Sequence, residues 1–210
     1  MTEALTLYTH PMSRGRITRW MLEETGADYR TEIVGYGPAM KSPDYLAINP
    51  MGKVPAIRHG DTIVTECAAI CAYLADAFPA AELAPAPADR GAYYRWLFFA
   101  AGPLEAAVSD KVLGVEVPED KQGMIGYGTF AAVIDVLEKC LPRDGYIAGD
   151  RFSAADVYLG SHLGWGLEFG SIDHRPIFED YVGRMRDRDA YRRAKAMDDE
   201  AMPKEQQQAS

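Results

Sequence analysis

The sequence predicts an α/β domain followed by an all-helical domain, on the strength of three observations. About the first eighty residues alternate short apolar runs, typical of buried strands, with segments of helical spacing. The composition then changes at PAAELAPAPADRG, residues 79–91, which is rich in alanine and proline as interdomain linkers are. Beyond it the hydrophobic pattern is helical, with no convincing strand. The expected organisation is a first domain at 1–78, a linker at 79–87, a helical domain at 88–200 and a frayed tail at 201–210.

In the first domain the expected order is strand, helix, strand, hairpin and helix. ALTLY, residues 4–8, is a short buried strand that ends at the turn cluster THPMS. A helix with apolar residues at helical spacing follows and ends at Gly26. The remaining segments are a strand in YRTEIVGY, a hairpin around His59, Gly60 and Asp61, and a helix in TECAAICAYLADAF. This is too short for a doubly wound nucleotide-binding sheet, so we expect a compact mixed sheet.

Helical patterns fill the second half of the chain. The first contains Pro103, where we expect a kink. The second runs through EDKQGMIGYGTFAAVIDVLEKC; its GYGTFA, residues 126–131, formally matches a dinucleotide fingerprint. No strand precedes this motif, so we interpret it as close helix packing. Ser153 and Asp156 have capping-box spacing and predict the start of a buried helix.

Composition excludes several function classes. The 22 basic and 31 acidic residues give a net charge of -9, which repels nucleic-acid phosphates and anionic lipid. The start of the chain lacks signal-peptide features, and the apolar stretch WLFFAAGPLEAAV is interrupted by Glu105 before membrane length. Three cysteines without a CxxC pair suit reduced thiols, and the four histidines show no metal-ligand spacing. We therefore expect a cytoplasmic protein without metal, nucleic acid or membrane partners.

Pro55, in NPMGKVPAI at residues 49–57, stands at the start of an expected strand. Proline has no amide hydrogen for a sheet, so its place there needs a reason. The residues alone favour an ordinary trans bond at a sheet edge. A cis bond would instead turn the backbone of Val54 outward, where its amide and carbonyl could pair with a short extended peptide. The residues leave both interpretations open.

A family resemblance bears on this choice. The order of LTLY, SRGRITRWMLEETG, NPMGKVPAI and TECAAICAYLAD, followed by an all-helical second half, resembles the cytosolic glutathione S-transferase family, in particular bacterial serine-type members. The similarity covers nearly the whole chain. It implies the glutathione transferase fold, an α/β thioredoxin-like N-terminal domain plus an all-α C-terminal helical bundle. It further implies a homodimer that uses reduced glutathione as co-substrate.

The resemblance also implies the glutathione-binding residues. It makes the bond before Pro55 cis and pairs the backbone of Val54 with the cysteinyl unit of glutathione. It brings Glu66 to the γ-glutamyl ammonium, and the amide and side chain of Cys67 to the neighbouring carboxylate. A helix start favours such an anion.

Two features of this glutathione site stay open. The family usually has serine where Cys67 stands, and a thiol donates more weakly than a hydroxyl. The residues alone favour a structural role for Glu66, as an acid in a first helical turn capped by Thr65. The resemblance leaves two lysines, Lys41 and Lys53, as partners for the glycyl carboxylate.

Ser13 is the candidate catalytic residue. The residues alone favour a cap for the first helix, which it opens. In the serine-type classes that the chain resembles, this hydroxyl donates to the glutathione sulfur and holds it as thiolate. Lowering a thiol pKa by two units needs about 2.7 kcal/mol, and a hydrogen bond to a charged group contributes about 1.5–3 kcal/mol. Tyr8, where tyrosine-type members carry their hydroxyl, is the second candidate, and Arg14 or Arg16 adds positive potential.

The expected reaction adds the thiolate to an apolar electrophile. A pocket for it would use one face of the aromatic run, with Tyr127 or Trp165; the run comprises Tyr93, Tyr94, Trp96, Leu97, Phe98 and Phe99. Peroxide reduction, isomerisation or dehalogenation would use the same glutathione site. Two other classes stay open, a non-catalytic interaction or stress-response module and a thiol oxidoreductase acting through Cys67.

Overall fold

The structure is a computed structural model that describes residues 3–202. The chain folds into two compact units, one formed by the residues up to Leu83 and from Asp187 on, the other by Ala84–Arg186. The first unit contains the sheet. The boundary between Leu83 and Ala84 falls inside the segment where the composition predicts a linker, between the 3-10 turns η2 (Pro79–Ala81) and η3 (Pro87–Asp89).

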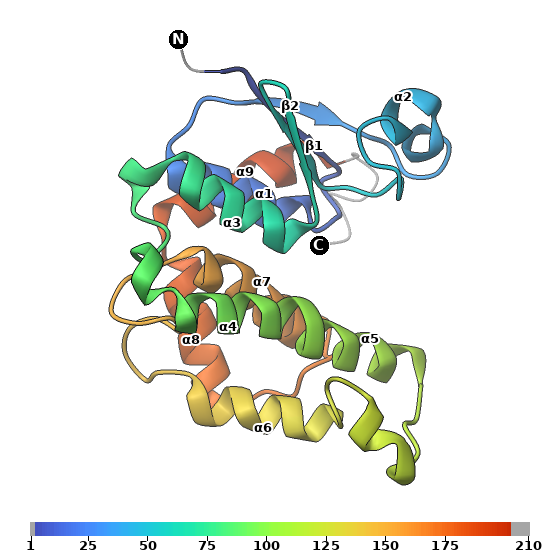
Figure 1. Ribbon diagram of the computed structural model, residues 1–210, viewed down its shortest axis with the longest axis vertical. Helices are drawn as coiled ribbons and strands as arrows, with labels where there is room; N and C mark the ends of the chain where they lie inside the picture. The colour runs from blue at the N-terminus through green and yellow to red at the C-terminus, as the bar shows by residue number, and fades with distance from the viewer. Residues whose placement is uncertain (1–2, 203–210) are drawn as a thin grey trace. The chain divides into compact units, whose positions relative to one another are not determined.

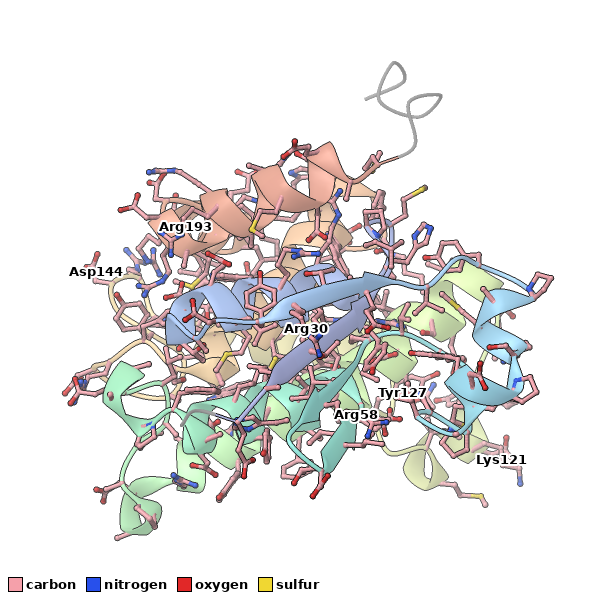
Figure 2. All side chains as sticks on the ribbon, turned by 90° about the horizontal axis from the view of Figure 1, so that it is seen from above. Arg30, Arg58, Lys121, Tyr127, Asp144 and Arg193 are labelled. Atoms are coloured by element: carbon pink, nitrogen blue, oxygen red, sulfur yellow. The ribbon has the colours of Figure 1, made fainter. Side chains whose placement is uncertain are left out.

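A four-stranded mixed sheet forms the centre of the first unit (Figure 1). Its strands are β1 (Leu5–Thr9), β2 (Arg30–Ile33), β3 (Ala56–His59) and β4 (Thr62–Thr65), in the order β2-β1-β3-β4. β1 is parallel to β2 and antiparallel to β3, and β3 is antiparallel to β4. Thr6 of β1 stands opposite Arg30 on one side and Arg58 on the other, the two arginines labelled in Figure 2. The predicted mixed sheet is confirmed.

Helices cover one side of this sheet. α1 (Gly15–Thr25) and α3 (Cys67–Ala77) pack against each other and against the strands, while η1 (Ala39–Lys41) and α2 (Pro43–Leu46) lie in the connection to β3 (Figure 1). Gly26 ends α1 with a left-handed φ of 67°, which confirms its predicted role as a C-terminal glycine. In the hairpin, His59 pairs with Thr62, and Gly60 takes a positive φ in the tight turn between them.

The second unit is helical in its described residues, apart from one isolated bridge between Tyr146 and Gly149. Pro103 lies in a π-helical segment, Ala100–Leu104, where the wider turn accommodates its missing amide hydrogen. The kink expected at Pro103 stays a prediction. The helices of this unit are α4 (Gly91–Phe99), α5 (Glu105–Leu113), the 3-10 segment η5 (Glu119–Met124), α6 (Phe130–Cys140), α7 (Ala154–Glu168) and α8 (Pro176–Arg186).

The buried helix α7 starts at the predicted capping box. The Asp156 carboxylate is fully buried and accepts hydrogen bonds from the Ser153 amide at 3.0 Å, the Ile147 amide at 2.8 Å and the Tyr181 hydroxyl at 2.7 Å. Burial raises the pKa of Asp156, although these hydrogen bonds oppose the shift. Its role is structural, because it joins the start of α7 to the preceding loop and to α8.

The segment 119–140 departs from the expected continuous helix. η5 ends at Met124, Gly128 adopts a left-handed φ of 67°, and Thr129 caps α6 by accepting a hydrogen bond from the Ala132 amide. GYGTFA is therefore a turn followed by a helix start, and the interpretation as close helix packing was wrong. Glycine permits the left-handed turn, which a helical periodicity does not reveal.

The last helix differs from the expected domain division. α9 (Asp189–Glu200) belongs to the first unit and packs along α1, whereas the sequence analysis included it in a helical domain at 88–200. Arg19 and Asp198 form a buried ion pair at 2.8 Å, and Arg193, labelled in Figure 2, pairs with Glu23. Most of the predicted frayed tail, from residue 203 on, lies outside the described residues.

Candidate functional site

The starts of α1 and α3 lie side by side, and this brings two predicted site residues into neighbouring segments. The Cys67 thiol, at the first residue of α3, lies 3.7 Å from the carbonyl oxygen of Arg14 and 3.6 Å from the Thr18 hydroxyl. Ser13 immediately precedes Arg14. Two helix N-termini, each the positive end of a helix dipole, therefore lie next to each other in the first unit.

The Ser13 hydroxyl takes part in two hydrogen bonds. It donates to the carbonyl oxygen of His10 at 2.7 Å and accepts from the Gly15 amide at 3.0 Å. The second bond pairs the first amide of α1, although the N-cap of this helix is Arg14 and not Ser13, the cap that the residues alone favour. The His10 carbonyl also accepts from the Ser13 amide at 3.0 Å, so it keeps a partner if the hydroxyl proton turns elsewhere. Ser13 is half-buried, as a side chain at the rim of a site would be.

Sequence reasoning missed two residues that shape the segment before Ser13, His10 within it and Tyr36, which packs against it. The rings of His10 and Tyr36 have centroids 4.0 Å apart, and the Tyr36 hydroxyl donates to the carbonyl of Met12 at 2.9 Å. Burial lowers the pKa of His10, and its Nδ1 accepts a hydrogen bond from the Met12 amide. Tyr36 follows β2 in a turn without periodicity, so no local pattern indicates this contact.

The loop before β3 is held by buried polar side chains. The carbonyl of Lys53 accepts from the Tyr45 hydroxyl at 2.7 Å and the Asn49 amide group at 2.8 Å, while Asn49 Oδ1 accepts from the Met51 amide at 3.0 Å. The Val54–Pro55 peptide bond is cis, as the sequence analysis expects from the family resemblance. Burial raises the pKa of Tyr45 to about 12, so it remains a donor at neutral pH.

The two lysines beside this loop differ in their surroundings. Lys41 Nζ donates to the carbonyls of Met51 at 2.8 Å and Gly52 at 3.1 Å, so its ammonium braces the loop. The Lys53 side chain is exposed next to the cis bond. The structure thus gives Lys41 a bracing role in the loop that residue type alone did not reveal.

Tyr8, the second candidate for thiol activation, is part of a buried cluster. It is 8% exposed and packs with Tyr45, Met40 and Ala56, and its ring centroid lies 6.1 Å from that of Tyr45. The strand that carries it aligns it with the core of the first unit. This burial favours a packing role for Tyr8 over contact with a ligand.

Glu66 is the N-cap of α3, so Thr65 is not. Its φ of 64° is unusual for a residue other than glycine, its ψ is 114°, and its side chain is exposed. Such backbone strain concentrates at binding sites. Cys67 is 8% exposed with its thiol turned inward, and Cys71 is buried, as predicted. The hydrogen bond between Cys71 and Cys67, together with burial, raises the pKa of Cys71.

Two family models match the chain. The N-terminal domain of glutathione S-transferases matches residues 12–77, and the C-terminal domain of the same family matches residues 88–165. Glutathione S-transferase 3 of Zea mays is 32% identical over 164 residues, which cover 73% of this chain and 74% of that protein. The chain belongs to the glutathione S-transferase family.

This transferase also has bacterial relatives. Glutathione S-transferase GstA of Escherichia coli O157:H7 is 28% identical and covers 83% of this chain and 90% of its own length. The crystal structure of a glutathione transferase from Methylococcus capsulatus superimposes with a TM-score of 0.77 at 30% identity, covering 93% of this chain and 98% of its own. A homologue from Sulfitobacter, solved with bound glutathione, has a TM-score of 0.75 at 30% identity and covers 92% and 98%.

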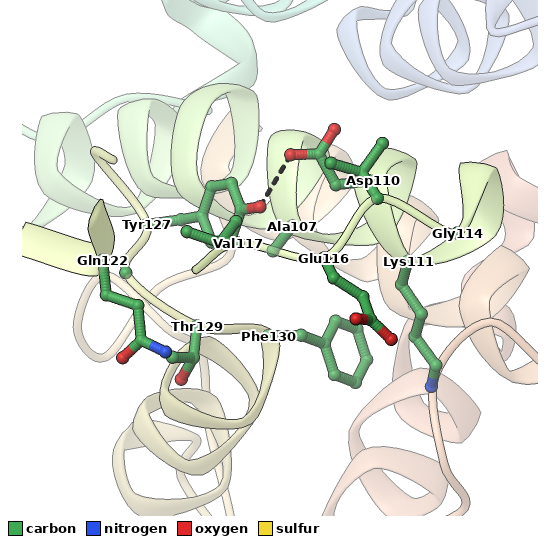
Figure 3. A pocket seen from close by; sticks show the side chains of 12 residues that line it. Ala107, Asp110, Lys111, Gly114, Glu116, Val117, Gln122, Tyr127, Thr129 and Phe130 are labelled. Carbon is green, nitrogen blue, oxygen red and sulfur yellow. Dashed lines mark hydrogen bonds between the residues drawn. The ribbon is translucent and has the colours of Figure 1, made fainter. Parts of the chain in front are cut away.

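The helical unit of the transferase contains a pocket of about 350 Å³ (Figure 3). It lies between the end of α5 and the segment that leads to α6. Tyr127, which the sequence analysis named as a pocket residue, donates its hydroxyl to Asp110 at 2.6 Å there, and Lys111 stacks on the Phe130 ring at 4.0 Å. The lining is mixed, because Glu116 and Gln122 join these side chains.

The aromatic run of α4 divides between core and surface. Tyr93, Trp96 and Leu97 are buried, so they are core residues of the helical unit. Tyr94 and Phe98 are exposed, at 43% and 72%. Trp165 does not line the pocket beside Tyr127.

Over residues 3–202 of the transferase, His, Cys, Asp and Glu side chains nowhere gather in a group of three or more able to hold a metal ion. Among the same residues, the helices are too short or too polar to cross a membrane.

Proposed function

We propose that this transferase binds reduced glutathione at the joined starts of α1 and α3, and that Ser13 stabilises its thiolate for transfer to an electrophile. The observation that carries the proposal is the position of Ser13, one residue before the carbonyl that the Cys67 thiol contacts. Family membership and the glutathione found in the Sulfitobacter homologue support the ligand. Two helix N-termini supply a positive potential for an anionic tripeptide.

The Ser13 hydroxyl has to change its hydrogen bond to act in this way. Its proton would leave the His10 carbonyl and turn to the sulfur, while its oxygen continues to accept from the Gly15 amide. A hydrogen bond to a thiolate contributes about 1.5–3 kcal/mol, and the neutral bond given up contributes about 1 kcal/mol. The net gain of about 0.5–2 kcal/mol lowers the thiol pKa by about 0.4–1.5 units. The start of α1 adds about 0.3–1 kcal/mol.

The γ-glutamyl end of glutathione would bind at the start of α3. The exposed carboxylate of Glu66 would face the ammonium, and the Cys67 amide would face the carboxylate. The Cys67 side chain points to Arg14 and Thr18, so the amide alone would contribute here.

The cysteinyl and glycyl parts would bind along the loop before β3. The backbone of Val54 would pair with the cysteinyl unit, in the manner that the family resemblance implies. Lys53 is the better partner for the glycyl carboxylate, because Lys41 already braces the loop through Met51 and Gly52. The buried donors Tyr45 and Asn49 keep this loop rigid, which reduces the entropy lost on binding.

Three finer assignments belong to the same proposal. We expect transfer to alkyl and aryl electrophiles, a homodimer and a cytoplasmic location, all supported by membership of the family. The structure favours no particular electrophile. Conjugation would rest on thiol ionisation and on the proximity of the two substrates.

The experiment compares Ser13→Ala with Ser13→Thr, which keeps a hydroxyl, and with Thr129→Ala, which removes a helix cap in the other unit. Glutathione binding is measured by calorimetry, the thiol pKa of bound glutathione by ultraviolet difference spectroscopy, and kcat/KM with an activated aryl chloride. We expect Ser13→Ala to raise the thiol pKa by about one unit and to lower kcat/KM about tenfold below that pKa, with Ser13→Thr and Thr129→Ala close to wild type.

Three outcomes would contradict the proposal. Full activity of Ser13→Ala would exclude its catalytic role. Failure of the wild-type protein to bind glutathione would favour a non-catalytic interaction module with the transferase fold. Loss of activity in Cys67→Ala but not in Ser13→Ala would favour a thiol oxidoreductase.

A further inference from the structure

The segment that carries Ser13, residues 10–14, is held by donors at several of its carbonyls, and we call it the Ser13 loop. The His10 carbonyl accepts from the Ser13 amide and hydroxyl, and the Met12 carbonyl accepts from Tyr36. The Pro11 carbonyl accepts from Arg16 Nε. Since Ser13 N bonds back to His10, Pro11 is one of the two residues enclosed by this turn, and its position affects that of Ser13.

Arg16 connects this loop to the last helix of the chain. While its Nε binds Pro11, its Nη1 donates to Asp199 Oδ1 of α9 at 2.8 Å. The Lys195 ammonium, one turn earlier on α9, donates to the other oxygen of Asp199. Although burial raises the pKa of Asp199, the hydrogen bonds from Lys195 and Arg16 outweigh it and lower the pKa, so the carboxylate is ionised at neutral pH.

The geometry of the guanidinium makes this bridge directional. A guanidinium is planar and presents its N–H groups in a fixed fork, so fixing one end on Asp199 also fixes the direction of Nε toward Pro11. The ion pair itself is partly exposed, with side-chain exposures of 24% and 44%. Exposed pairs of this kind contribute little to stability. We therefore expect that an effect of Asp199 on the reaction would not come from a loss of stability of the fold.

We propose that Asp199 is a positioning residue, which through Arg16 holds the Ser13 loop in the shape that lets the Ser13 hydroxyl stabilise the glutathione thiolate. This rests on the proposed function of Ser13. The last helix would then contribute to thiol activation although none of the residues proposed above to bind glutathione lies in it. Arg16 and Asp199 are 183 positions apart in the chain.

The sign of the effect separates positioning from simple electrostatics. Replacing Asp199 by asparagine removes a negative charge, and it releases a positive one on Arg16. Both changes acting through space would lower the pKa of a nearby thiol. Loss of positioning weakens the hydrogen bond from Ser13 to the thiolate and raises that pKa. The two explanations therefore predict shifts in opposite directions.

The test titrates the thiol of bound glutathione by ultraviolet difference spectroscopy in wild type, Asp199→Asn, Asp199→Glu, Arg16→Lys and the combined Arg16→Lys/Asp199→Asn variant. Asp189→Asn is the matched control, since Asp189 lies on the same helix and pairs with Arg192. We expect Asp199→Asn to raise the thiol pKa by about 0.5–1 unit, which means about 3–10-fold less thiolate below the pKa. Arg16→Lys should raise the thiol pKa by a similar amount, and the combined variant should raise it no further. Asp199→Glu should raise the thiol pKa less than Asp199→Asn does, and Asp189→Asn should leave it unchanged.

Two further measurements complete the test. Binding of S-methylglutathione, which has no ionisable thiol, should be unchanged in Asp199→Asn, because only thiolate stabilisation is affected. An unchanged or lowered thiol pKa in Asp199→Asn, with a raised one in Ser13→Ala, would overturn this inference alone. An unchanged thiol pKa in Ser13→Ala would overturn the proposed function and this inference with it.

Discussion

Replacing Asp198 by alanine removes one half of a buried ion pair between α9 and α1. Asp198 Oδ1 accepts from Arg19 Nε at 2.8 Å, and the side chains are 1% and 3% exposed. Arg19 also donates to the Tyr29 hydroxyl at 3.3 Å and to Thr31 Oγ1 at 3.1 Å, so its guanidinium joins α1, β2 and α9. Without Asp198, this positive charge stays buried with only neutral partners.

The expected cost follows from that burial. Removing one partner of a buried ion pair costs about 3–5 kcal/mol, because the other charge is left uncompensated. In a chain of this size, each kcal/mol lowers Tm by about 2–4 °C, which gives a decrease of roughly 6–20 °C. Replacing both residues, as Arg19→Met/Asp198→Leu, should recover most of the loss, since a well-packed apolar pair often matches a buried ion pair.

The decrease in Tm of Asp198→Ala is measured by thermal unfolding, monitored by circular dichroism. Hydrogen exchange of the amides of residues 189–200 shows whether the destabilisation lies in α9. The control is Arg192→Met, which breaks the exposed pairs with Asp187 and Asp189 and should cost less than about 1 kcal/mol. If Asp198→Ala destabilises the protein no more than Arg192→Met does, α9 does not dock on α1 through a buried pair. The positioning role of Asp199 would then lose its structural basis.

Three other predictions concern single positions. Gly15→Ala would place a Cβ 1.7 Å from Thr9 Oγ1 and 3.0 Å from Ser13 Oγ. We expect urea unfolding to show a free energy of unfolding lower by about 1–3 kcal/mol because of overpacking, and adding Thr9→Ala should recover part of it. Full stability of Gly15→Ala would contradict this close packing. Asp156→Ala should cost more than about 3 kcal/mol, because four buried donor groups lose their acceptor, and a Tm close to wild type would refute this. The pKa of Asp199 is lowered in the folded protein, so its contribution to stability is present above the unfolded pKa of about 4 and is lost as pH falls through the folded pKa. On acidification from about pH 5 to pH 3, Asp199→Asn should therefore lose less stability than the wild type does. Parallel curves of stability against pH for the two proteins would contradict this prediction.

Much of the site is readable from local sequence. Strand, turn and helix around Ser13, the loop NPMGKVPAI and the helix that begins after Glu66 each depend on neighbouring residues, and the structure has all three. The details within them were less accessible. Three contacts were not predicted: Lys41 with its loop, the Cys67 thiol with the Arg14 carbonyl, and the Ser13 hydroxyl with the His10 carbonyl. Each depends on which atoms lie within about 3–4 Å of each other, and the residue type alone does not determine this.

The helical half shows the same limit. Periodicity predicted the helices of this half, yet it extended one of them through Gly128, because periodicity does not indicate a left-handed φ at a single glycine. Periodicity also assigned α9 to the helical domain, because the pattern of a helix does not indicate which other helix packs against its apolar face.

The sequence by itself determined the family and the order of elements, because these follow from motifs and from short-range preferences of the backbone. Only the tertiary structure decided that α9 packs on α1 and that Asp199 reaches Arg16 beside the Ser13 loop. Contacts between residues far apart in the chain depend on how the elements pack, and the complementary charges appear in the sequence as ordinary surface residues until that packing brings them together.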